Sequence, residues 1–389
     1  MGAGTPRARG RRNSTFRDAG KVWPVQGTRY WAVPRIEVRR VHYVFKAKEK
    51  QMNRTYRAVQ VTQPGKLEVV ERTLVEPSFG QVRIKVEACG VCHTDALTVE
   101  GGMPGQTYPR VPGHEAIGTI EAVGPGVQGW KTGQRVGVGY MGGHCGYCKS
   151  CRRGDFVNCQ NQPISGVHSD GGYAEMIIAQ ASGLAAIPDD LLPTEAAPLL
   201  CAGLTTFNGL RNSKARPGDL VAIQGVGGLG HLGIQFARQM GFQVAAIARG
   251  PEKESLARKL GAHHYIDSNA QDPVAALQAL GGARLIVATA AISKSMSPLL
   301  GGLAPCGELV VAGAGGNDPI EVNPVPLLFG MRSIAGTMTG SSIDAEDTLF
   351  FSSQQGVRPM IETVPLASAA EAYQRMMRNE ARFRIVLVP

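Results

Sequence analysis

Four cysteines in the first half of the chain are spaced like the ligands of a single metal ion. They follow the pattern C-x2-C-x2-C-x7-C, as Cys145, Cys148, Cys151 and Cys159. Four thiolates at this spacing can close a tetrahedron around Zn²⁺. Disulfides and an iron–sulfur cluster are alternatives, but neighbouring cysteines two residues apart rarely meet disulfide geometry, and the spacing matches neither common ferredoxin pattern. The pattern predicts a structural zinc site, which has no open coordination position and does no chemistry.

Three further residues could form a second metal site that does chemistry. Cys92 lies in GVCHTD (residues 90–95), His114 in VPGHEAIG (111–118) and Cys201 in APLLCAGLTTF. A catalytic zinc ion takes three protein ligands and keeps a fourth position for water or substrate, and two thiolates with one imidazole suit it. Each residue alone has an ordinary interpretation, because a buried cysteine is usually a small hydrophobe. Their occurrence together with the four-cysteine loop favours the metal site.

A glycine-rich turn lies between a predicted strand and a predicted helix. It follows the continuous apolar run LVAIQG in the segment LVAIQGVGGLGHLG. Its residues are Gly225, Gly227, Gly228, Leu229 and Gly230. Such glycines allow a tight turn and let backbone N–H groups approach a pyrophosphate at the N-terminus of the helix. A glycine-rich turn can also serve close packing alone, but this strand–turn–helix context predicts dinucleotide binding.

The end of the next predicted strand, VAAIA, determines which dinucleotide we expect. An NAD site has Asp or Glu there, which binds the ribose 2′-hydroxyl. This chain has Ala248, followed by Arg249. A guanidinium group at this place would attract a 2′-phosphate, and the alternative is a solvated arginine on a surface turn. We therefore predict NADP in preference to NAD.

The elements that would position these residues fall into two kinds of region. Up to about Pro198 the chain is typical of short strands and loops, and in VRIKVEA (82–88) alternate residues are apolar. From about Leu204, continuous apolar strands alternate with helical segments, the first of them at 229–240. This alternation is typical of a parallel sheet covered on both faces. The chain ends in the strand-like FRIVLVP.

The net charge of +10 does not indicate a nucleic-acid partner. Residues 1–51 hold 13 of the 41 basic and 3 of the 31 acidic residues, so 28 of each remain for the rest of the chain. A balanced body gives no reason to expect a polyanion, and we expect neither a nucleic-acid nor a membrane partner. No apolar run approaches the roughly 18 residues of a membrane helix, and no secretory signal is evident, so we expect a cytoplasmic protein.

Residues 1–51 form a basic N-terminal extension that we expect to lie outside the fold. It could be an organellar transit peptide, which is also Arg-rich and acid-poor, or a disordered tail. It could also be upstream sequence translated from a misplaced start, with Met52 as the true initiator. We favour this last interpretation because MNRTYRAVQVTQPGKLEVVE is typical of the opening strands of a domain.

From about Met52 to its end the chain resembles the zinc-dependent medium-chain alcohol dehydrogenases, in the bacterial and yeast-like branch related to the cinnamyl-alcohol type. The resemblance rests on GVCHTD, VPGHEAIG, the four-cysteine loop, APLLCAGLTT and GVGGLGHLG, all in the family's order. It implies an α/β protein with a GroES-like β-rich catalytic domain over 52–204, a doubly wound Rossmann domain over 205–336, and a return to the catalytic domain over 337–389. It also implies two zinc ions per chain and a homodimer or homotetramer.

The resemblance implies a role for each matching residue. Cys92, His114 and Cys201 would be the ligands of the catalytic zinc, with Glu115 able to approach it and Asp95 orienting the ligating histidine. Thr94 would hydrogen-bond the substrate hydroxyl. The cofactor would be held by His93 and Arg384 at the pyrophosphate and by Thr205 at the nicotinamide. Tyr140 and Met103 would line the substrate pocket. Many relatives end a proton relay with a histidine where this chain has Leu97, so the relay here would end in water or another group.

The implied reaction is reversible hydride transfer between an alcohol, preferably a primary one, and a nicotinamide cofactor, giving the aldehyde or ketone. One alternative is a zinc-free quinone reductase of the same superfamily, although such relatives lack the Cys–His ligand set. Another is a nucleic-acid-binding zinc module built on the four-cysteine loop. The balanced charge of the body weighs against this module.

Overall fold

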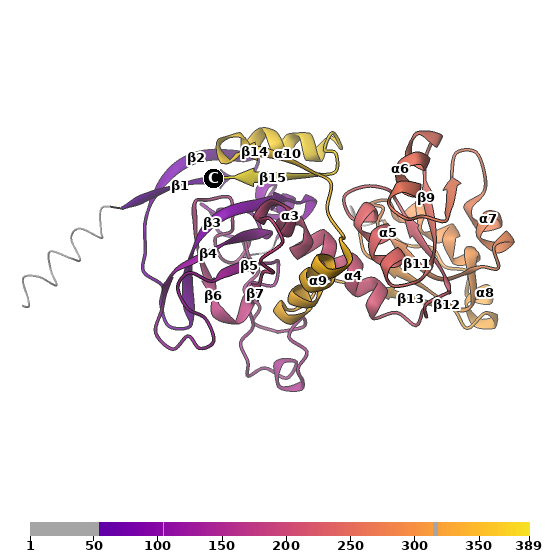
Figure 1. The fold of residues 1–389 in the computed structure, drawn as a ribbon, viewed down its shortest axis with the longest axis horizontal. Helices are drawn as coiled ribbons and strands as arrows, with labels where there is room; N and C mark the ends of the chain where they lie inside the picture. Colours follow the sequence, from indigo (N-terminus) through magenta and orange to yellow (C-terminus); the bar gives the residue numbers. More distant parts are fainter. Residues whose placement is uncertain (1–53, 104, 314–317) are drawn as a thin grey trace, which may run out of the picture. The chain divides into compact units, whose positions relative to one another are not determined.

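The computed structural model describes residues 54–103, 105–313 and 318–389, so the predictions for residues 1–51 lie outside the described residues. Two large sheets dominate the described part (Figure 1). In the first, the strands follow the order β14-β15-β3-β4-β5-β7, and β6 also pairs with β3. The strands are β3 (Gln81–Val91), β4 (Ala116–Val123), β5 (Arg135–Val138), β6 (Met176–Gln180), β7 (Leu184–Ala186), β14 (Ile361–Pro365) and β15 (Arg384–Val388). A separate antiparallel pair, β1 (Thr55–Gln63) and β2 (Lys66–Thr73), precedes them.

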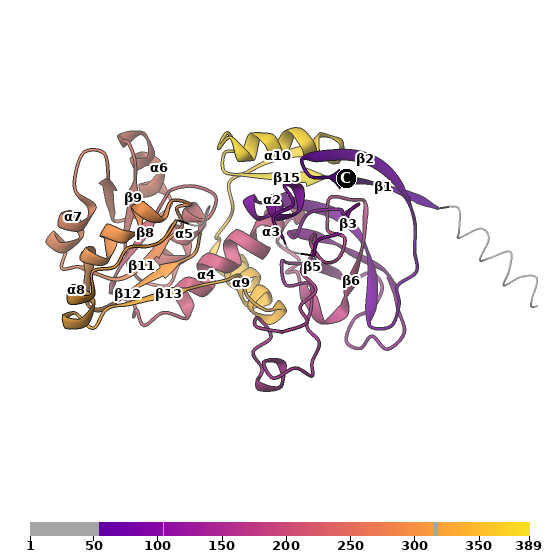
Figure 2. The same cartoon turned by 180° about the vertical axis from the view of Figure 1, so that it is seen from behind.

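The alternation predicted in the first long strand is confirmed. In β3, Val82, Ile84, Val86 and Ala88 are all buried and Lys85 is exposed, but Arg83 on the other face is also buried, where it pairs with Glu121. The last strand of the chain, β15, pairs antiparallel with the end of β3. The C-terminal end of the chain therefore completes a sheet that its N-terminal half began, and the strands involved lie side by side in Figures 1 and 2.

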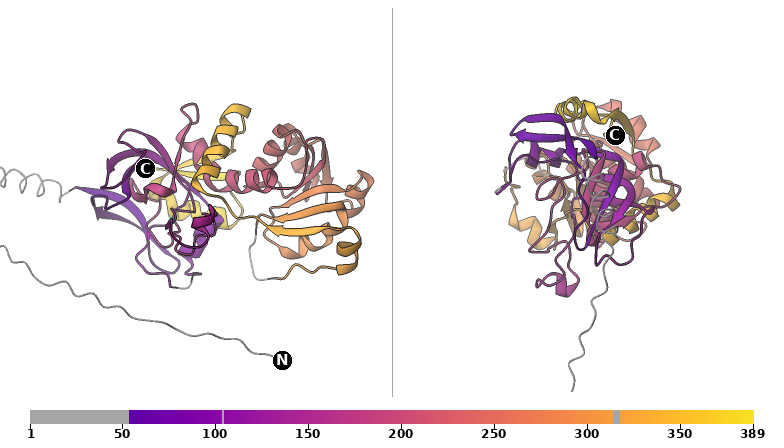
Figure 3. Two further views of the ribbon diagram at one scale, coloured as in Figure 1. Left: turned by 90° about the horizontal axis from the view of Figure 1, so that it is seen from below. Right: turned by 90° about the vertical axis from the view of Figure 1, so that its left-hand side faces the viewer.

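The second sheet has six parallel strands in the order β10-β9-β8-β11-β12-β13. They are β8 (Leu220–Gln224), β9 (Gln243–Ala248), β10 (His264–Asp267), β11 (Ala283–Ala288), β12 (Leu303–Val311) and β13 (Ser333–Gly336). Helices connect them: α5 (Gly230–Gln239), α6 (Glu254–Lys259), α7 (Pro273–Ala279) and α8 (Pro324–Phe329). The strand order reverses between β8 and β11, which is the doubly wound arrangement, and helices lie on both sides of the strands (Figure 3).

The remaining helices pack around the first sheet, except that the helix following Cys201 packs on α5 and β11 of the second sheet. They are α2 (Ala96–Val99), α3 (Pro193–Pro198), α4 (Leu204–Arg211), α9 (Ser342–Gln355) and α10 (Ala369–Met377). The expectation of strands and loops up to Pro198 was wrong for α3, which is short and mostly buried and so lacks an amphipathic period. Between α3 and α4 the backbone forms a π-helical turn, Leu199–Gly203, which carries Cys201. Among the described residues, no helix is long and apolar enough to cross a bilayer.

The glycine-rich turn between β8 and α5 is as tight as the sequence predicts. Gly225 has a φ of +94°, which favours glycine, and its N–H donates to the Ile247 carbonyl at 2.8 Å. A Cβ on Gly230 would lie 1.7 Å from the Gly225 carbonyl oxygen. A Cβ on Gly227 would meet no atom within 4 Å. Gly230 is therefore required by packing, whereas Gly227 leaves open space.

These two glycines make a matched pair for a stability measurement. Gly230→Ala should lower the free energy of unfolding by about 1–3 kcal/mol or more, because the backbone carbonyl in its way cannot rotate aside. Gly227→Ala should change it by less than about 1 kcal/mol, because its Cβ has room. Denaturant titration of the wild type and both variants checks this. Equal destabilisation by the two substitutions would contradict the steric argument.

Candidate functional site

Four buried side chains bring their donor atoms together next to the end of β3. Cys92, His114, Glu115 and Cys201 each offer one ligand atom, and these atoms all lie within 4.8 Å of one another. The Sγ atoms of Cys92 and Cys201 are 3.7 Å apart. The structure thus brings together the three residues predicted as catalytic metal ligands, with Glu115 as a fourth member.

The first sheet explains how these residues meet. Cys92 directly follows β3, and His114 and Glu115 directly precede β4, its antiparallel partner. Because the end of one antiparallel strand lies beside the start of the next, both loops open at one place, and the Gly90 N–H donates to the Glu115 carbonyl at 3.1 Å. The π-helical turn adds Cys201, which lies 109 residues after Cys92 in the chain.

Asp95 holds the cluster through three hydrogen bonds. Its carboxylate accepts from His114 Nδ1, from the Cys92 backbone N–H and from the Tyr173 hydroxyl, each at 2.9 Å. The hydrogen bond at Nδ1 leaves Nε2 of His114 as the free ring nitrogen, and Nε2 is buried without a hydrogen-bond partner. A buried polar atom without a partner is costly. Two thiols and an oriented imidazole with a free nitrogen, all buried, fit a zinc ion.

Burial and mutual contacts shift the pKa values of the ionisable groups in the cluster. The hydrogen bond from Cys201 holds the pKa of the Cys92 thiol well below its usual range, and the same contact raises that of Cys201. Burial raises the pKa of Glu115 to about 7, although the neighbouring Arg384 opposes this shift. A dry site that favours a thiolate is a site that attracts a cation.

Arg384 lies between this cluster and the glycine-rich turn. Its Nη2 donates to Oε1 of Glu115 in a buried ion pair. Its Cδ and Nη1 lie 3.4 Å from the point that a Cβ on Gly228 would occupy. The residue predicted to face the cofactor pyrophosphate therefore borders the turn as expected, but its charge is paired with Glu115, a contact that the sequence did not indicate.

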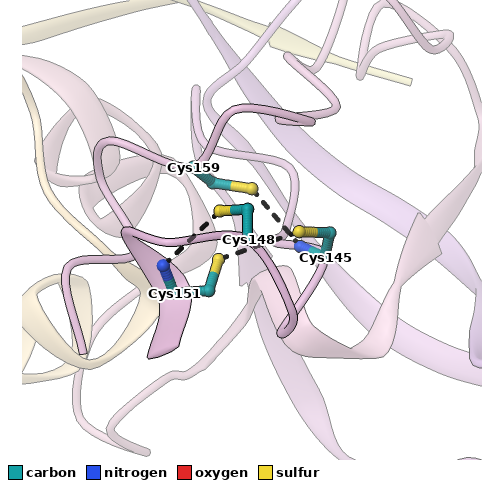
Figure 4. A group of neighbouring side chains, drawn as sticks. All are labelled: Cys145, Cys148, Cys151 and Cys159. Carbon is teal, nitrogen blue, oxygen red and sulfur yellow. Dashed lines mark hydrogen bonds between the residues drawn. The ribbon is translucent and has the colours of Figure 1, made fainter. Parts of the chain in front are cut away.

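The four-cysteine loop forms the second cluster (Figure 4). The Sγ atoms of Cys145, Cys148, Cys151 and Cys159 all lie within 4.8 Å of one another. Backbone N–H groups donate to two of these sulfurs: Cys145 N to Cys159 Sγ at 3.4 Å and Cys151 N to Cys148 Sγ at 3.5 Å. All eight cysteines of the chain are free thiols, so the disulfide alternative is wrong. The cluster fits a closed tetrahedral zinc site.

The other predicted site residues lie at varying distances from the first cluster. Thr94 is half-buried and His93 exposed in the 3₁₀ turn that follows Cys92, and Leu97 follows in α2. Thr205 is buried in α4, one helical turn after Cys201. The Tyr140 ring stands edge-on to His114, with ring centroids 5.5 Å apart. Met103 is half-buried in the loop after α2.

At the end of β9, Ala248 is buried and Arg249 is exposed. Asp267, at the end of the neighbouring strand β10, pairs in register with Ala248. Its carboxylate accepts the backbone N–H groups of Gly250 at 2.8 Å and Asn269 at 2.9 Å. The Asp267 carboxylate is thus bound to the main chain, and a second carboxylate lies close by, since a Cβ on Gly250 would be 2.1 Å from an oxygen of Glu252.

Sequence reasoning missed two buried residues of this region. Tyr173, which bonds Asp95, lies in a Gly–Gly–Tyr turn that carries no recognisable site pattern. His231, whose ring bonds Gly227 and Met360, follows the last glycine of the turn. A polar residue at an otherwise apolar helix position was the only available signal for His231.

Comparison with known proteins agrees with this geometry. Residues 78–189 match the alcohol dehydrogenase GroES-like domain, and residues 228–354 match the zinc-binding dehydrogenase family. The chain is 44% identical over 334 residues to alcohol dehydrogenase patD of Penicillium expansum, covering 86% of this chain and 97% of that protein. It is 40% identical over 321 residues to an alcohol dehydrogenase of Geobacillus stearothermophilus, covering 82% and 94%.

Solved structures show the same fold. The crystal structure of AibC superposes with a TM-score of 0.82 at 30% identity, covering 88% of this chain and 98% of that one. A cinnamyl alcohol dehydrogenase from Sorghum bicolor superposes with a TM-score of 0.78 at 31% identity, covering 86% and 98%. With the GroES-like and Rossmann architecture and both cysteine clusters in place, the chain belongs to the zinc-dependent medium-chain alcohol dehydrogenases and is an oxidoreductase of alcohols.

Proposed function

We propose that the protein transfers hydride reversibly between a primary alcohol and NADP, with one catalytic and one structural zinc ion per chain. The buried donor set of Cys92, His114 and Cys201 carries this proposal, since the Nε2 of His114 is buried and has no other partner. Glu115 stays beside these ligands, held by Arg384. The four-cysteine cluster would hold the second ion and stabilise its loop.

A zinc ion in the first cluster would supply Lewis acidity, which lowers the pKa of an alcohol towards neutrality. The chain's own residues do the rest. Asp95 keeps the His114 ring in one tautomer and one orientation, and Tyr173 and the Cys92 N–H keep Asp95 in place. Thr94 would hydrogen-bond the alcohol hydroxyl, accept its proton and pass a proton on. With Leu97 unable to carry a proton, the proton would leave through water or another group.

The cofactor would lie against the glycine-rich turn, with its pyrophosphate facing the backbone N–H groups of the turn and Arg384. His93 would contribute beside it, and Thr205 would position the nicotinamide. Holding both reactants in one orientation removes much of the entropic barrier to hydride transfer. We divide the chain into catalytic (52–204 and 337–389) and Rossmann (205–336) parts, because β14 and β15 pair with the first sheet.

NADP is favoured by the end of β9. Ala248 offers no carboxylate to a ribose hydroxyl, and Arg249 is exposed and free to reach a 2′-phosphate. The carboxylates of Asp267 and Glu252 lie near this strand end and would act against a phosphate, so the proposal depends on Arg249 reaching it. Among the structural neighbours, one is described in complex with NAD and another bound to NADP, so the family likeness leaves the choice to these residues.

A homodimer would cover an apolar surface beside the edge strand β13. This strand ends the second sheet, and the helix α8 before it exposes Val325, Leu328 and Phe329, with Met331 exposed just after. An open strand edge and an apolar surface together suit pairing with a second copy of the chain. The eight free thiols, seven of them in or beside metal-binding clusters, suit the reducing cytoplasm.

The two alternative functions find less support. A zinc-free quinone reductase would have no use for a converged Cys–His–Cys set. A nucleic-acid module on the four-cysteine loop would act apart from the glycine-rich turn, yet that loop lies within the matched dehydrogenase domain.

Removing one ligand from each cluster should separate the two metals. Cys201→Ala should lose one of two zinc ions and abolish turnover while keeping the melting temperature within a few degrees, because the site is catalytic. Cys148→Ala should lose the other zinc ion and lower both melting temperature and solubility, because the closed site staples a loop. Metal analysis, calorimetry and turnover measure these effects. Full activity in Cys201→Ala would refute the ligand assignment.

The cofactor choice can be read from kcat/KM with NADP and with NAD at one primary alcohol and one ionic strength. We expect a preference for NADP of about tenfold to hundredfold, the range of one charge-assisted contact to phosphate. Ala248→Asp combined with Arg249→Gly should reverse the order, because a carboxylate repels the phosphate. A tenfold preference of the wild type for NAD would show Arg249 to be a solvated surface residue.

The oligomeric state can be measured by sedimentation. The wild type should sediment as a dimer or a larger assembly. Leu328→Asp combined with Phe329→Asp should give monomers at micromolar concentration, because the substitutions place charges in an apolar interface. Ile343→Asp, at an exposed apolar residue on α9, serves as the control and should leave the assembly intact. A monomeric wild type would contradict the proposed interface.

A further inference from the structure

His231 is a fully buried polar side chain that the mechanism above does not use. It is the second residue of α5, directly after the glycine-rich turn. Its Nδ1 lies 2.9 Å from the Gly227 carbonyl oxygen, and its Nε2 lies 3.1 Å from the backbone N–H of Met360. An N–H can only donate, so Nε2 accepts, and Nδ1 must carry the proton that it donates to Gly227. Burial lowers the pKa of His231 to about 4, which keeps this tautomer neutral near pH 7.

The carbonyl of Gly227 is held by two donors. The backbone N–H of His231 reaches it at 3.1 Å, and the ring adds the bond at 2.9 Å. In a planar trans peptide the carbonyl oxygen of one residue and the N–H of the next point in opposite directions. Fixing the Gly227 oxygen towards α5 therefore fixes the direction of the Gly228 N–H. A flip of this peptide would turn an oxygen, instead of a donor, towards any anion bound at the turn.

The other side of the imidazole holds the segment from which Arg384 emerges. Besides donating to His231, Met360 accepts the N–H groups of both Phe383 and Arg384 at 3.1 Å. The Phe383 ring stacks on His231, with centroids 5.2 Å apart and planes 17° from parallel. The side chain of Arg384 in turn borders Gly228. One imidazole thus contacts both the turn and the backbone that carries the arginine.

A second side chain on α5 grips the same segment without contacting the turn. One helical turn after His231, the Gln235 side chain donates to the Arg358 carbonyl at 3.0 Å and accepts the Arg358 N–H at 3.2 Å. Gln235 therefore provides a comparison on the same helix: it bonds the same segment twice through Arg358 and also donates to the His231 carbonyl at 3.1 Å, but it does not bond a glycine of the turn.

We propose that His231 is a positioning residue for the cofactor pyrophosphate, which fixes the Gly228 N–H and Arg384 in one geometry towards the phosphate oxygens. The inference rests on the proposed function, since it needs a dinucleotide at the turn. A buried histidine that only filled space would need no partner on two different elements, whereas here each ring nitrogen bonds the main chain of a separate one.

The test is the affinity of the zinc-loaded protein for NADPH and NADH, titrated by fluorescence without alcohol. His231→Phe keeps a stacked ring and loses both hydrogen bonds, and we expect Kd for the tighter cofactor to rise about tenfold. Zinc content and the KM for alcohol at saturating cofactor should stay unchanged. Gln235→Met should lower the melting temperature about as much as His231→Phe does. It should change Kd by less than about twofold. His231→Asn places an amide donor near Nδ1 and should restore most of the affinity.

An unchanged Kd in His231→Phe would overturn the proposal, as would losses in Kd that follow the melting temperature equally in His231→Phe and Gln235→Met. If His231→Phe is insoluble, His231→Leu, which also loses both hydrogen bonds, takes its place in the comparison with Gln235→Met, and an unchanged Kd in His231→Leu would overturn the proposal. Failure of the proposed function would look different, because the wild type itself would then bind neither NADPH nor NADH.

Discussion

The structure depends on the burial of four side chains that could hold a metal ion at the end of β3. Cys92, His114, Glu115 and Cys201 are withdrawn from water, and Nε2 of His114 and Oε2 of Glu115 have no hydrogen-bond partner. Such burial is unfavourable unless a cation or further partners satisfy the atoms. Asp95 satisfies one side of the cluster and Arg384 the other. The polar atoms that remain without a partner are ones that a bound zinc ion would satisfy.

This requirement explains the path of the chain. The ligands come from the loops at the paired ends of β3 and β4 and from a π-helical turn between α3 and α4. A π-helical turn inserts an extra residue into a helix and so redirects one side chain, which is why such turns are frequent at functional sites. The whole parallel sheet follows in the sequence. After it, β15 pairs with β3, and this pairing places Arg384 beside Glu115.

The metal cluster and the glycine-rich turn are consequently connected by a short series of contacts. Glu115 pairs with Arg384, Arg384 borders Gly228, and the backbone at Arg384 bonds Met360, which is held by His231. An anion bound at the turn would compete with Glu115 for the same guanidinium. Binding at the turn would then alter the charge beside the metal ligands, because a buried carboxylate that loses its partner becomes harder to keep ionised.

The sequence by itself determined which chemistry the chain carries and which kinds of element hold it. The cysteine spacing, the motifs GVCHTD and VPGHEAIG and the glycine-rich turn after an apolar strand are local patterns, and each depends on residues close together in the chain. Residue periodicity likewise predicted β3 and α5, whereas the parallel strands were predicted from continuous apolar runs such as LVAIQG, which are buried on both faces. The short helix α3 was missed because it is too short and too buried to show such a period.

Only the tertiary structure decided which residues form hydrogen bonds and ion pairs with one another inside the site. Arg384 and Glu115 are 269 residues apart, Met360 and His231 129, and Tyr173 and Asp95 78. The sequence predicted Arg384 as a pyrophosphate ligand but gave no sign of its ion pair, and it did not single out Tyr173 or His231 at all. These contacts arise from strand pairing and helix packing between distant segments. No spacing along the chain encodes them, because the number of intervening residues is set by the strands, loops and helices that lie between the partners and not by the contact itself.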